Sequence, residues 1–216
     1  MRAASWALAA VLAATPLAAN ADLLRDQDAW RVVEAPNKEP AAFRHLADGG
    51  LEVRADGALG FYYRETNPGQ VLAWRWRVDI APPPTDQFEV GEDDRAIAVH
   101  LWCNREDSDV SFFGGIAELL GYPRITHTLT YVWGGAEPGG RVGVNPYYEN
   151  GRVWVLRGGD APAGWAIERR DIAADIQRAF GEDISLEDLR LVALSADTDD
   201  SGGLSHARIA DLAWTP

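Results

Sequence analysis

Residues 72–79 read Leu-Ala-Trp-Arg-Trp-Arg-Val-Asp, and this stretch decides the fold class. Large apolar side chains occupy every second position, and charged side chains occupy most of the positions between them. A period of two residues is typical of a β-strand that buries one face. The strand is expected to end at Pro82-Pro83-Pro84, because proline has no backbone N–H to donate to a sheet. The acidic stretch 89–94 that follows predicts a surface loop.

Similar strand signals recur along the chain, each short, rich in aromatic or β-branched residues and bounded by turn residues. They lie at 96–103, 127–133, 153–157, 165–169, 189–196 and 207–214, with shorter candidates at 51–53 and 59–64. An acidic start, apolar residues at helical spacing and a glycine stop predict one helix from Asp171 to Gly181. Residues 115–120 fit either a second short helix or a lid loop. The pattern predicts an all-β fold, an antiparallel β-sandwich most simply arranged as a jelly roll, with one or two short helices.

The composition fits a single domain. The chain has 216 residues, which is enough for one sizeable hydrophobic core and short for two. A total of 33 acidic residues against 20 basic ones gives a net charge of -13, which argues against nucleic acid or anionic lipid as a partner. The single cysteine, Cys103, excludes an intramolecular disulfide and a cysteine-based zinc cluster. We expect one β-sandwich domain over residues 22–216, with its oligomeric state left open.

The first 21 residues predict a secretory signal peptide. Arg2 precedes an apolar run at 3–14, and small residues end the segment at Ala19-Asn20-Ala21. These features match the three regions of a signal peptide, and the run is much shorter than the ~20 residues of a membrane-spanning helix. Cys103 lies far from the cleavage position, so we expect no lipid anchor. The sequence therefore predicts a periplasmic or secreted protein without membrane insertion.

Cleavage after Ala21 is expected to leave Asp22 as the first residue of the exported protein. Intact-mass measurement on protein recovered from the periplasm or the medium checks this prediction. A mass that still includes residues 1–21 would contradict it.

An ordered set of motifs extends through the second half of the chain. It contains Leu-Thr-Tyr-Val-Trp at 129–133, Asn-Pro-Tyr at 145–147, Trp165 with Glu168 and Arg170-Asp171, Asp175, Phe180-Gly181, Asp-Thr-Asp-Asp-Ser-Gly at 197–202 and Ile-Ala-Asp-Leu at 209–212. Together with Trp-Arg-Trp-Arg-Val at 74–78 and Asp-Asp-Arg at 93–95, this order resembles the DUF3047 family of exported bacterial proteins over most of residues 70–214. The resemblance implies a β-sandwich similar to carbohydrate-binding modules and lectins, and it implies no particular reaction.

Aromatic residues provide candidate ligand platforms. The chain has 9 tryptophans and 6 tyrosines, and flat aromatic rings stack on the apolar C–H faces of sugars. The candidate binding residues in strands, at strand ends or in turns are Trp102, His127, Tyr131, Trp133, Asn145 and Tyr147. Each aromatic residue among them also fits a core position, since aromatic strand residues usually pack inside.

The stretch 165–171 combines an aromatic ring with charges. Trp165 is a candidate sugar platform, and alternation along the strand places Glu168 and Arg170 on one face. These two side chains fit a sugar-binding polar pair, and they fit equally a structural ion pair with each other or with a neighbouring strand. Asp171 fits the N-cap of the predicted helix.

The loop 197–202 is a candidate calcium site. Asp197 and Asp199 stand at alternate positions ahead of Gly202, an arrangement in which several oxygens can converge on a hard cation. The loop is not an EF-hand, because its twelfth position is Arg208 and not glutamate. The same residues also form a good hairpin turn without any metal. A structural calcium site and a metal-free turn therefore both remain open.

Catalytic motifs are sparse. The four histidines show no metal-binding spacing, and the sequence contains no Gly-x-Ser-x-Gly or phosphate-binding loop motif. The leading hypothesis is an exported, non-catalytic module that binds a glycan or another cell-envelope component through an aromatic-lined sheet face. The acidic net charge favours a neutral glycan. The alternatives are a polysaccharide lyase or glycosidase, with a site near His127, Tyr131 and Arg124, and a module that binds other envelope proteins.

Overall fold

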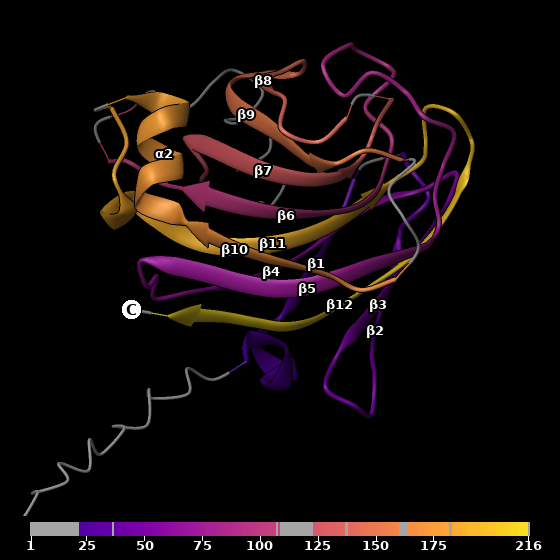
Figure 1. Cartoon of the computed structure of the whole chain (residues 1–216), viewed down its shortest axis with the longest axis horizontal. Coiled ribbons are helices and arrows are strands. Elements are labelled where there is room, and N and C mark those ends of the chain that lie inside the picture. The colour runs from indigo at the N-terminus through magenta and orange to yellow at the C-terminus, as the bar shows by residue number, and fades with distance from the viewer. Residues whose placement is uncertain are drawn as a thin grey trace, which may run out of the picture.

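The computed structural model describes residues 22–35, 37–106, 108, 123–136, 138–159, 164–181 and 183–215. The predicted signal peptide at 1–21 and the segment 115–120 lie outside these residues. Two β-sheets face each other and form a sandwich (Figure 1). Within the described ranges, no helix is long and apolar enough to cross a membrane.

The larger sheet has seven strands. In spatial order they are β1 (Arg31–Glu34), β4 (Leu59–Glu65), β11 (Leu189–Asp197), β6 (Arg95–Cys103), β7 (His127–Gly134), β9 (Tyr148–Arg157) and β8 (Val142–Asn145). All neighbours pair antiparallel except β7 and β9, which run parallel. The parallel pair arises because β8 takes the sheet edge and β9 returns between β8 and β7.

The smaller sheet has five antiparallel strands. In spatial order they are β10 (Ala166–Asp171), β5 (Val71–Ile80), β12 (Leu204–Thr215), β3 (Leu51–Asp56) and β2 (Ala42–His45). The predicted all-β sandwich is thus confirmed, with more strands than the sequence signals indicated. The strands without a clear signal are β1, β2 and β8, which have four residues each and lie at or next to sheet edges, where a weak apolar pattern is enough.

Helix α2 (Ile172–Phe180) forms where the sequence predicts it, and it lies at one end of the sandwich (Figure 1). The Asp171 side chain accepts a hydrogen bond from the Ala174 N–H at 3.1 Å, so it caps the first turn. Gly181 ends the helix with a φ of 68°. Ile172 and Ile176 are buried in the main core. The other helical segments within the described residues are the short 3-10 turns η1 (Leu23–Arg25), η2 (Gln27–Ala29) and η3 (Leu186–Asp188).

A layer of aromatic rings joins the two sheets. Trp74 and Trp76 of β5 point inward and are 1% and 0% exposed. The Trp74 ring packs on Tyr131 of β7 with 5.6 Å between centroids, and the Trp76 ring packs on Trp133 at 5.7 Å. Each aromatic pair adds about 0.5–1.5 kcal/mol beyond the burial of its area. The alternation at 72–79 therefore places on its buried face the residues that hold the sandwich together.

Strand β6 is buried on both faces. Its inward residues belong to the main core, whereas Ala98 and Trp102 point to the outer face of the larger sheet. Phe88, from the segment between β5 and β6, packs against the cluster that contains Ala98. Cys103 is fully buried, and burial raises the pKa of its thiol to about 12. Cys103 is therefore an unreactive core residue in this environment.

Two isoleucines in different environments test this description of the core. Ile97 in β6 is fully buried, whereas Ile167 in β10 is 75% exposed. The variant Ile97→Ala is expected to lower the free energy of unfolding by about 2–5 kcal/mol, because it leaves a cavity. The variant Ile167→Ala is expected to change it by less than about 0.5 kcal/mol. Denaturant unfolding followed by tryptophan fluorescence measures both, and equal effects would contradict the assigned burial.

Candidate functional site

Three of the predicted ring platforms are buried. Tyr131 and Trp133 are 0% and 2% exposed in the core, and Trp102 is 5% exposed against Leu191 and Ala193. A ring with no free face cannot stack on a sugar. The prediction of an aromatic-lined open sheet face is therefore wrong for these three residues. Alternation along β7 turned its aromatic residues toward the opposite sheet.

The predicted pair Glu168 and Arg170 shares the inward-facing side of β10, but the two residues do not pair with each other. Arg170 donates from Nε and Nη2 to the two carboxylate oxygens of Asp175, at 2.7 Å each. The Tyr131 hydroxyl donates to the same carboxylate at 2.6 Å. Glu168 accepts hydrogen bonds from Trp76 Nε1 at 3.0 Å and from Arg157 Nε at 2.7 Å.

These contacts favour the structural reading of Glu168 and Arg170 over the sugar-binding one. Each charge already has a partner of opposite sign, and each network also holds a buried aromatic residue in place. Asp175 fixes Tyr131, and Glu168 satisfies the indole N–H of Trp76. A buried indole N–H without an acceptor would be costly.

Two predicted aromatic residues remain exposed, on different sheets. Trp165, beside the smaller sheet, is 40% exposed and lies under the guanidinium of Arg75 at 4.5 Å. Tyr147, in the turn between β8 and β9, is 50% exposed, and its hydroxyl oxygen accepts a hydrogen bond from the Gly91 N–H at 2.6 Å. The Asn145 side chain accepts from the Tyr147 N–H at 2.9 Å. A ligand-binding role for these three residues stays a prediction.

The three residues expected for a lyase do not form one site. Tyr131 is fully buried and bonded to Asp175. His127 is half-buried at the start of β7 against the Phe180 ring, and burial lowers the pKa of its imidazole. Arg124 donates to Asn104 Oδ1 at 3.2 Å and to the Ser108 carbonyl at 2.9 Å. Because Tyr131 cannot reach a substrate, the predicted lyase constellation is not assembled.

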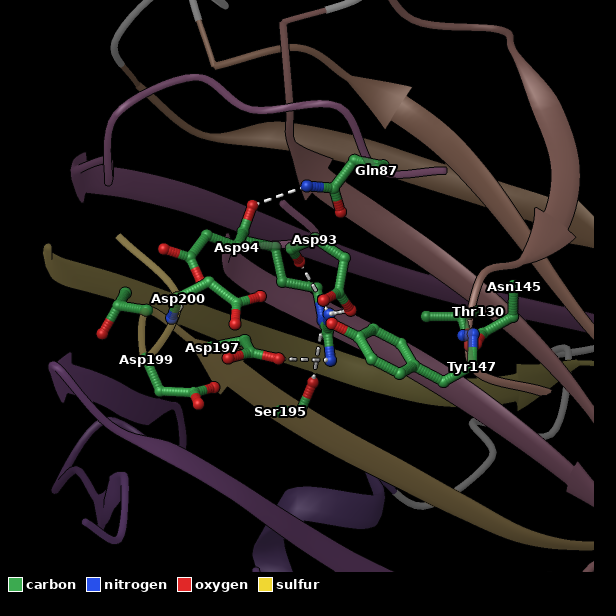
Figure 2. A network of polar contacts seen from close by, with 12 residues as sticks. Gln87, Asp93, Asp94, Thr130, Asn145, Tyr147, Ser195, Asp197, Asp199 and Asp200 are labelled. Carbon is green, nitrogen blue, oxygen red and sulfur yellow. Dashed lines mark hydrogen bonds and ion pairs between the residues drawn. The ribbon is translucent and has the colours of Figure 1, made fainter. Parts of the chain in front are cut away.

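The calcium prediction falls on a cluster of three carboxylates, here called the acidic centre and formed by Asp94, Asp197 and Asp199 (Figure 2). One oxygen from each side chain lies within 4.8 Å of the others. Asp197 ends β11 and is paired across the sheet with Arg95, the first residue of β6. This pairing brings the loop before β6 against the loop after β11. Asp94 was not predicted, although the motif at 93–95 contains it.

Asp94 holds the turn that follows β11. Its carboxylate accepts hydrogen bonds from the Ser201 N–H at 2.9 Å and the Asp200 N–H at 3.2 Å, and from the Ser201 hydroxyl. Gly202 has a φ of 65°, which a glycine adopts without strain. The predicted turn is therefore present. Its carboxylate cap comes from a distant loop.

A buried arginine, Arg95, lies beside the acidic centre. Arg95 is 7% exposed and donates from Nη1 to Asp93 Oδ2 at 2.8 Å. Its Nη2 lies 3.2 Å from Asp197 Oδ2, and its Nε lies 3.4 Å from Ser195 Oγ. Lys38 forms a further ion pair with Asp199. Two cations therefore face a larger number of carboxylates, since Asp93, Asp94, Asp197, Asp199 and Asp200 all lie in this region (Figure 2).

Asp197 is the carboxylate whose charge is least well satisfied. It is 4% exposed, and within the described ranges its Oδ1 accepts no hydrogen bond from a donor. Burial raises the pKa of Asp197 to about 8, against the lowering effect of Arg95. Burial also acts to raise the pKa of Asp199. Hydrogen bonds with Asp197 and Lys38 outweigh this effect, so the Asp199 pKa is lowered. The pKa values of Asp197 and Asp199 are therefore shifted in opposite directions.

A serine–histidine contact lies on the same face of the larger sheet. His100 Nε2 is 2.8 Å from Ser195 Oγ, and its Nδ1 is 3.0 Å from Thr130 Oγ1. Sequence reasoning missed this contact because the two partners are far apart in the chain. His100 is 5% exposed and Ser195 is 0% exposed. Burial lowers the pKa of His100 well below its usual range, so the trio is a neutral buried network out of reach of substrate.

The described residues also form an open cleft at the opposite end of the sandwich, here called the end cleft. Its volume is about 900 Å³. The ends of β4, β6 and β12 and the start of β11 meet there, whereas the acidic centre lies where β6 and β12 begin and β11 ends. The lining residues are Leu23, Arg64, Glu65, Thr66, Asn67, Pro68, Gly69, Asn104, Pro123, Arg124, Arg190, Leu191 and Trp214.

Comparison with known families gives one match. The family model described as "Protein of unknown function (DUF3047)" matches residues 28–213. The match includes both ends of the sandwich, and it begins after the predicted signal peptide. No curated protein matches the chain.

Several solved structures share a low level of similarity with this chain. The xyloglucanase domain of NopAA, a type three effector from Sinorhizobium fredii in complex with cellobiose, is 10% identical, with a TM-score of 0.45 over 92% of this chain and 98% of that chain. The native family 12 xyloglucanase from Bacillus licheniformis is 9% identical, with a TM-score of 0.38 over 84% and 95%. A structure titled "CBM4 structure and function" is 11% identical, with a TM-score of 0.34 over 94% and 99%. With TM-scores below 0.5, these likenesses carry no argument about function.

Proposed function

The chain belongs to the DUF3047 family, and we propose that it is an exported, non-catalytic protein that binds a glycan or another cell-envelope component in the end cleft. The observation that carries this proposal is the end cleft itself. Its volume of about 900 Å³ lies within the range of small-molecule sites, roughly 300–1,000 Å³. The export part of the proposal is supported by the signal-peptide pattern of residues 1–21.

The lining of the end cleft suits a sugar. Asn67, Asn104 and Thr66 offer amide and hydroxyl groups for hydrogen bonds to sugar hydroxyls, beside the apolar surface of Pro123. The Trp214 indole donates from Nε1 to Thr66 Oγ1 at 2.6 Å, which fixes that wall of the cleft. An adjoining hollow of about 500 Å³ contains Tyr63, whose ring offers a further stacking surface.

The same lining supports binding without catalysis. Among the described residues that line the end cleft, the single carboxylate is that of Glu65, and there is no histidine, cysteine or tyrosine. Glycoside cleavage ordinarily needs two carboxyl groups facing one bond. The end cleft therefore offers hydrogen-bonding groups but lacks the pair of acid and base that cleavage requires.

A protein-binding module is the alternative with less support. The exposed large apolar residues lie on separate elements and include Val32, Ile80, Val90, Val144, Ile167 and Leu204. Protein interfaces are expected to present a contiguous apolar patch. A cleft with polar walls fits a small polar ligand better than such a partner.

Glycoside hydrolysis at the acidic centre is a second candidate function, favoured by one observation. Asp197 has a raised pKa of about 8 and Asp199 a lowered pKa, and carboxyl groups with separated pKa values are typical of acid and base pairs. The burial of Asp197 counts against this candidate, because a polysaccharide would need to reach its carboxyl group.

Binding and cleavage are separated by one set of measurements. Isothermal titration calorimetry with a panel of neutral and uronate-containing oligosaccharides is expected to detect binding, and a reducing-end assay on the same mixtures is expected to detect no cleavage. The variant Asn67→Ala, in the end cleft, is expected to weaken binding about 2–10-fold through loss of one hydrogen bond. The exposed variant Ile167→Ala serves as the control and is expected to leave affinity unchanged.

Release of reducing ends that stops in Asp197→Asn would establish hydrolysis at the acidic centre and refute the non-catalytic proposal. An absence of binding to every oligosaccharide in the panel would refute the glycan part of the proposal.

We also propose that the acidic centre binds a structural Ca²⁺ ion through Asp94, Asp197 and Asp199. Carboxylate oxygens are the ligands that this cation prefers, and their mutual spacing of at most 4.8 Å lets one ion reach all three. Among the described residues, no donor reaches the buried Asp197 Oδ1, which supports a cation in that place. Such an ion would tie the loop before β6 to the turn after β11, remote from the end cleft.

Calcium is expected to stabilise the protein more strongly at high pH than at low pH. The folded-state pKa of Asp197, about 8, lies above the usual value, so in the metal-free protein this group favours folding at low pH and loses that contribution as pH rises through 8. The ion must displace the proton, so its affinity rises over the same interval. Calcium at about 100 times its Kd is expected to raise the Tm by roughly 5–10 °C.

Thermal melts of chelator-treated protein, with and without calcium at about pH 6 and about pH 8.5, measure this effect. The variant Asp197→Asn is expected to lose the calcium response. The exposed residue Asp28 provides the control, and Asp28→Asn is expected to keep it. An unchanged melt of the wild-type protein at both pH values would contradict the calcium proposal.

A further inference from the structure

The end cleft has a local charge opposite to that of the chain. Three arginines, Arg64, Arg124 and Arg190, line it together with one carboxylate, that of Glu65. The adjoining hollow adds Arg31. The whole chain carries a net charge of -13, so this grouping of guanidinium groups is not expected from its composition.

Two of these arginines donate hydrogen bonds to neutral acceptors. Arg124 donates to Asn104 Oδ1 and to the Ser108 carbonyl, which are neutral acceptors. Arg190 donates to the carbonyl oxygens of Glu187 and Leu189. Within the described ranges, neither guanidinium forms an ion pair with a carboxylate. These hydrogen bonds orient the guanidinium groups without neutralising them.

Arg64 is held against the start of the chain's described part. Its side chain is 14% exposed, and its Nη1 donates to the Leu23 carbonyl at 2.9 Å. Its nearest carboxylate partner is Asp26, at 3.6 Å and 64% exposed, and such a solvent-facing pair contributes little. Fixing this side chain against η1 holds a third positive charge at the wall of the end cleft.

We infer that the end cleft selects glycans that carry carboxylates, such as oligomers of hexuronic acid. This inference rests on the proposed glycan binding and names its ligand class. A guanidinium presents a planar set of N–H donors that matches both oxygens of a carboxylate, and charge-assisted hydrogen bonds are about twice as strong as neutral ones. The amide groups of Asn67 and Asn104 bind the uncharged hydroxyls of the same ligand.

The net charge of the chain does not prevent this selection. Expecting a neutral ligand follows from the whole-chain charge, but the carboxylates of the acidic centre lie at the far end of the sandwich. Strand β6 has 9 residues and spans roughly 30 Å between the two ends. The Debye length is about 10 Å at 0.1 M salt, so a bound ligand responds mainly to the charges that line the end cleft.

The test compares two ligands of equal length on the intact exported protein. Isothermal titration calorimetry is carried out with tetragalacturonate and with its neutral counterpart galactotetraose. The acidic tetramer is expected to bind at least about tenfold more tightly, with an affinity that falls as salt is raised from about 0.05 M to about 0.5 M. Galactotetraose is expected to show no such salt dependence.

Charge variants locate the effect in the end cleft. The variants Arg124→Gln and Arg190→Gln are each expected to lower affinity for tetragalacturonate several-fold and to leave affinity for galactotetraose nearly unchanged. Arg124→Lys retains the charge and loses the planar donor set, so an intermediate affinity is expected. Arg169→Gln is the matched control, because it removes the same charge from an exposed position on β10. It is expected to bind like the wild type, and thermal melts confirm that each variant is folded.

The outcomes separate this inference from the proposed function. Equal affinity for both tetramers would overturn the inference and leave glycan binding in place. The same holds if the arginine variants stay folded and bind the acidic tetramer like the Arg169→Gln control. If neither tetramer binds and no oligosaccharide of the wider panel binds, the proposed function is overturned, and the inference with it.

Discussion

The contact between Trp74 and Tyr131, with the adjacent contact between Trp76 and Trp133, sets the distance between the two sheets. The indole N–H of Trp76 in this aromatic layer donates to Glu168. The edge strand β10 is thereby tied to the core, and the Arg157 guanidinium that pairs with Glu168 ties in β9. The polar pairs at this edge are a consequence of burying tryptophan.

Two buried carboxylates show how neighbouring charged groups set the direction of a pKa shift. Glu52 and Asp197 are each 4% exposed. Burial acts to raise the pKa of Glu52, but hydrogen bonds from Arg44 and His206 outweigh it and lower that pKa to about 2. Asp197 has Arg95 as its cation and other carboxylates around it, so burial prevails and its pKa rises. The cations around Glu52 and the carboxylates around Asp197 therefore shift the two pKa values in opposite directions.

The two ends of the sandwich differ in charge and in openness. At one end, carboxylates from two loops converge around a buried arginine. Their oxygens accept hydrogen bonds from this arginine and from backbone N–H groups of the turn. At the other end, arginines from separate segments line an open cleft and donate to neutral oxygens. The first arrangement fits a stabilising role and the second fits a ligand site. Because the strands between them are rigid and paired, the two ends can carry separate tasks on one core.

The sequence by itself determined the strands with strong local patterns, the capped helix α2 and the turn at 197–202. The alternation at 72–79, the apolar run of β6 and the Asp171 cap are local signals, since each depends on residues near one another in the chain. Only the tertiary structure decided which face of β7 is inside, and it placed Tyr131 and Trp133 in the core. It also joined Asp94 to Asp197 and gathered Arg64, Arg124 and Arg190 around one cleft. A period of two residues shows that the faces of a strand alternate, but it does not reveal which strand lies beside it or which loop covers its end. Sheet pairing between distant segments sets those neighbours.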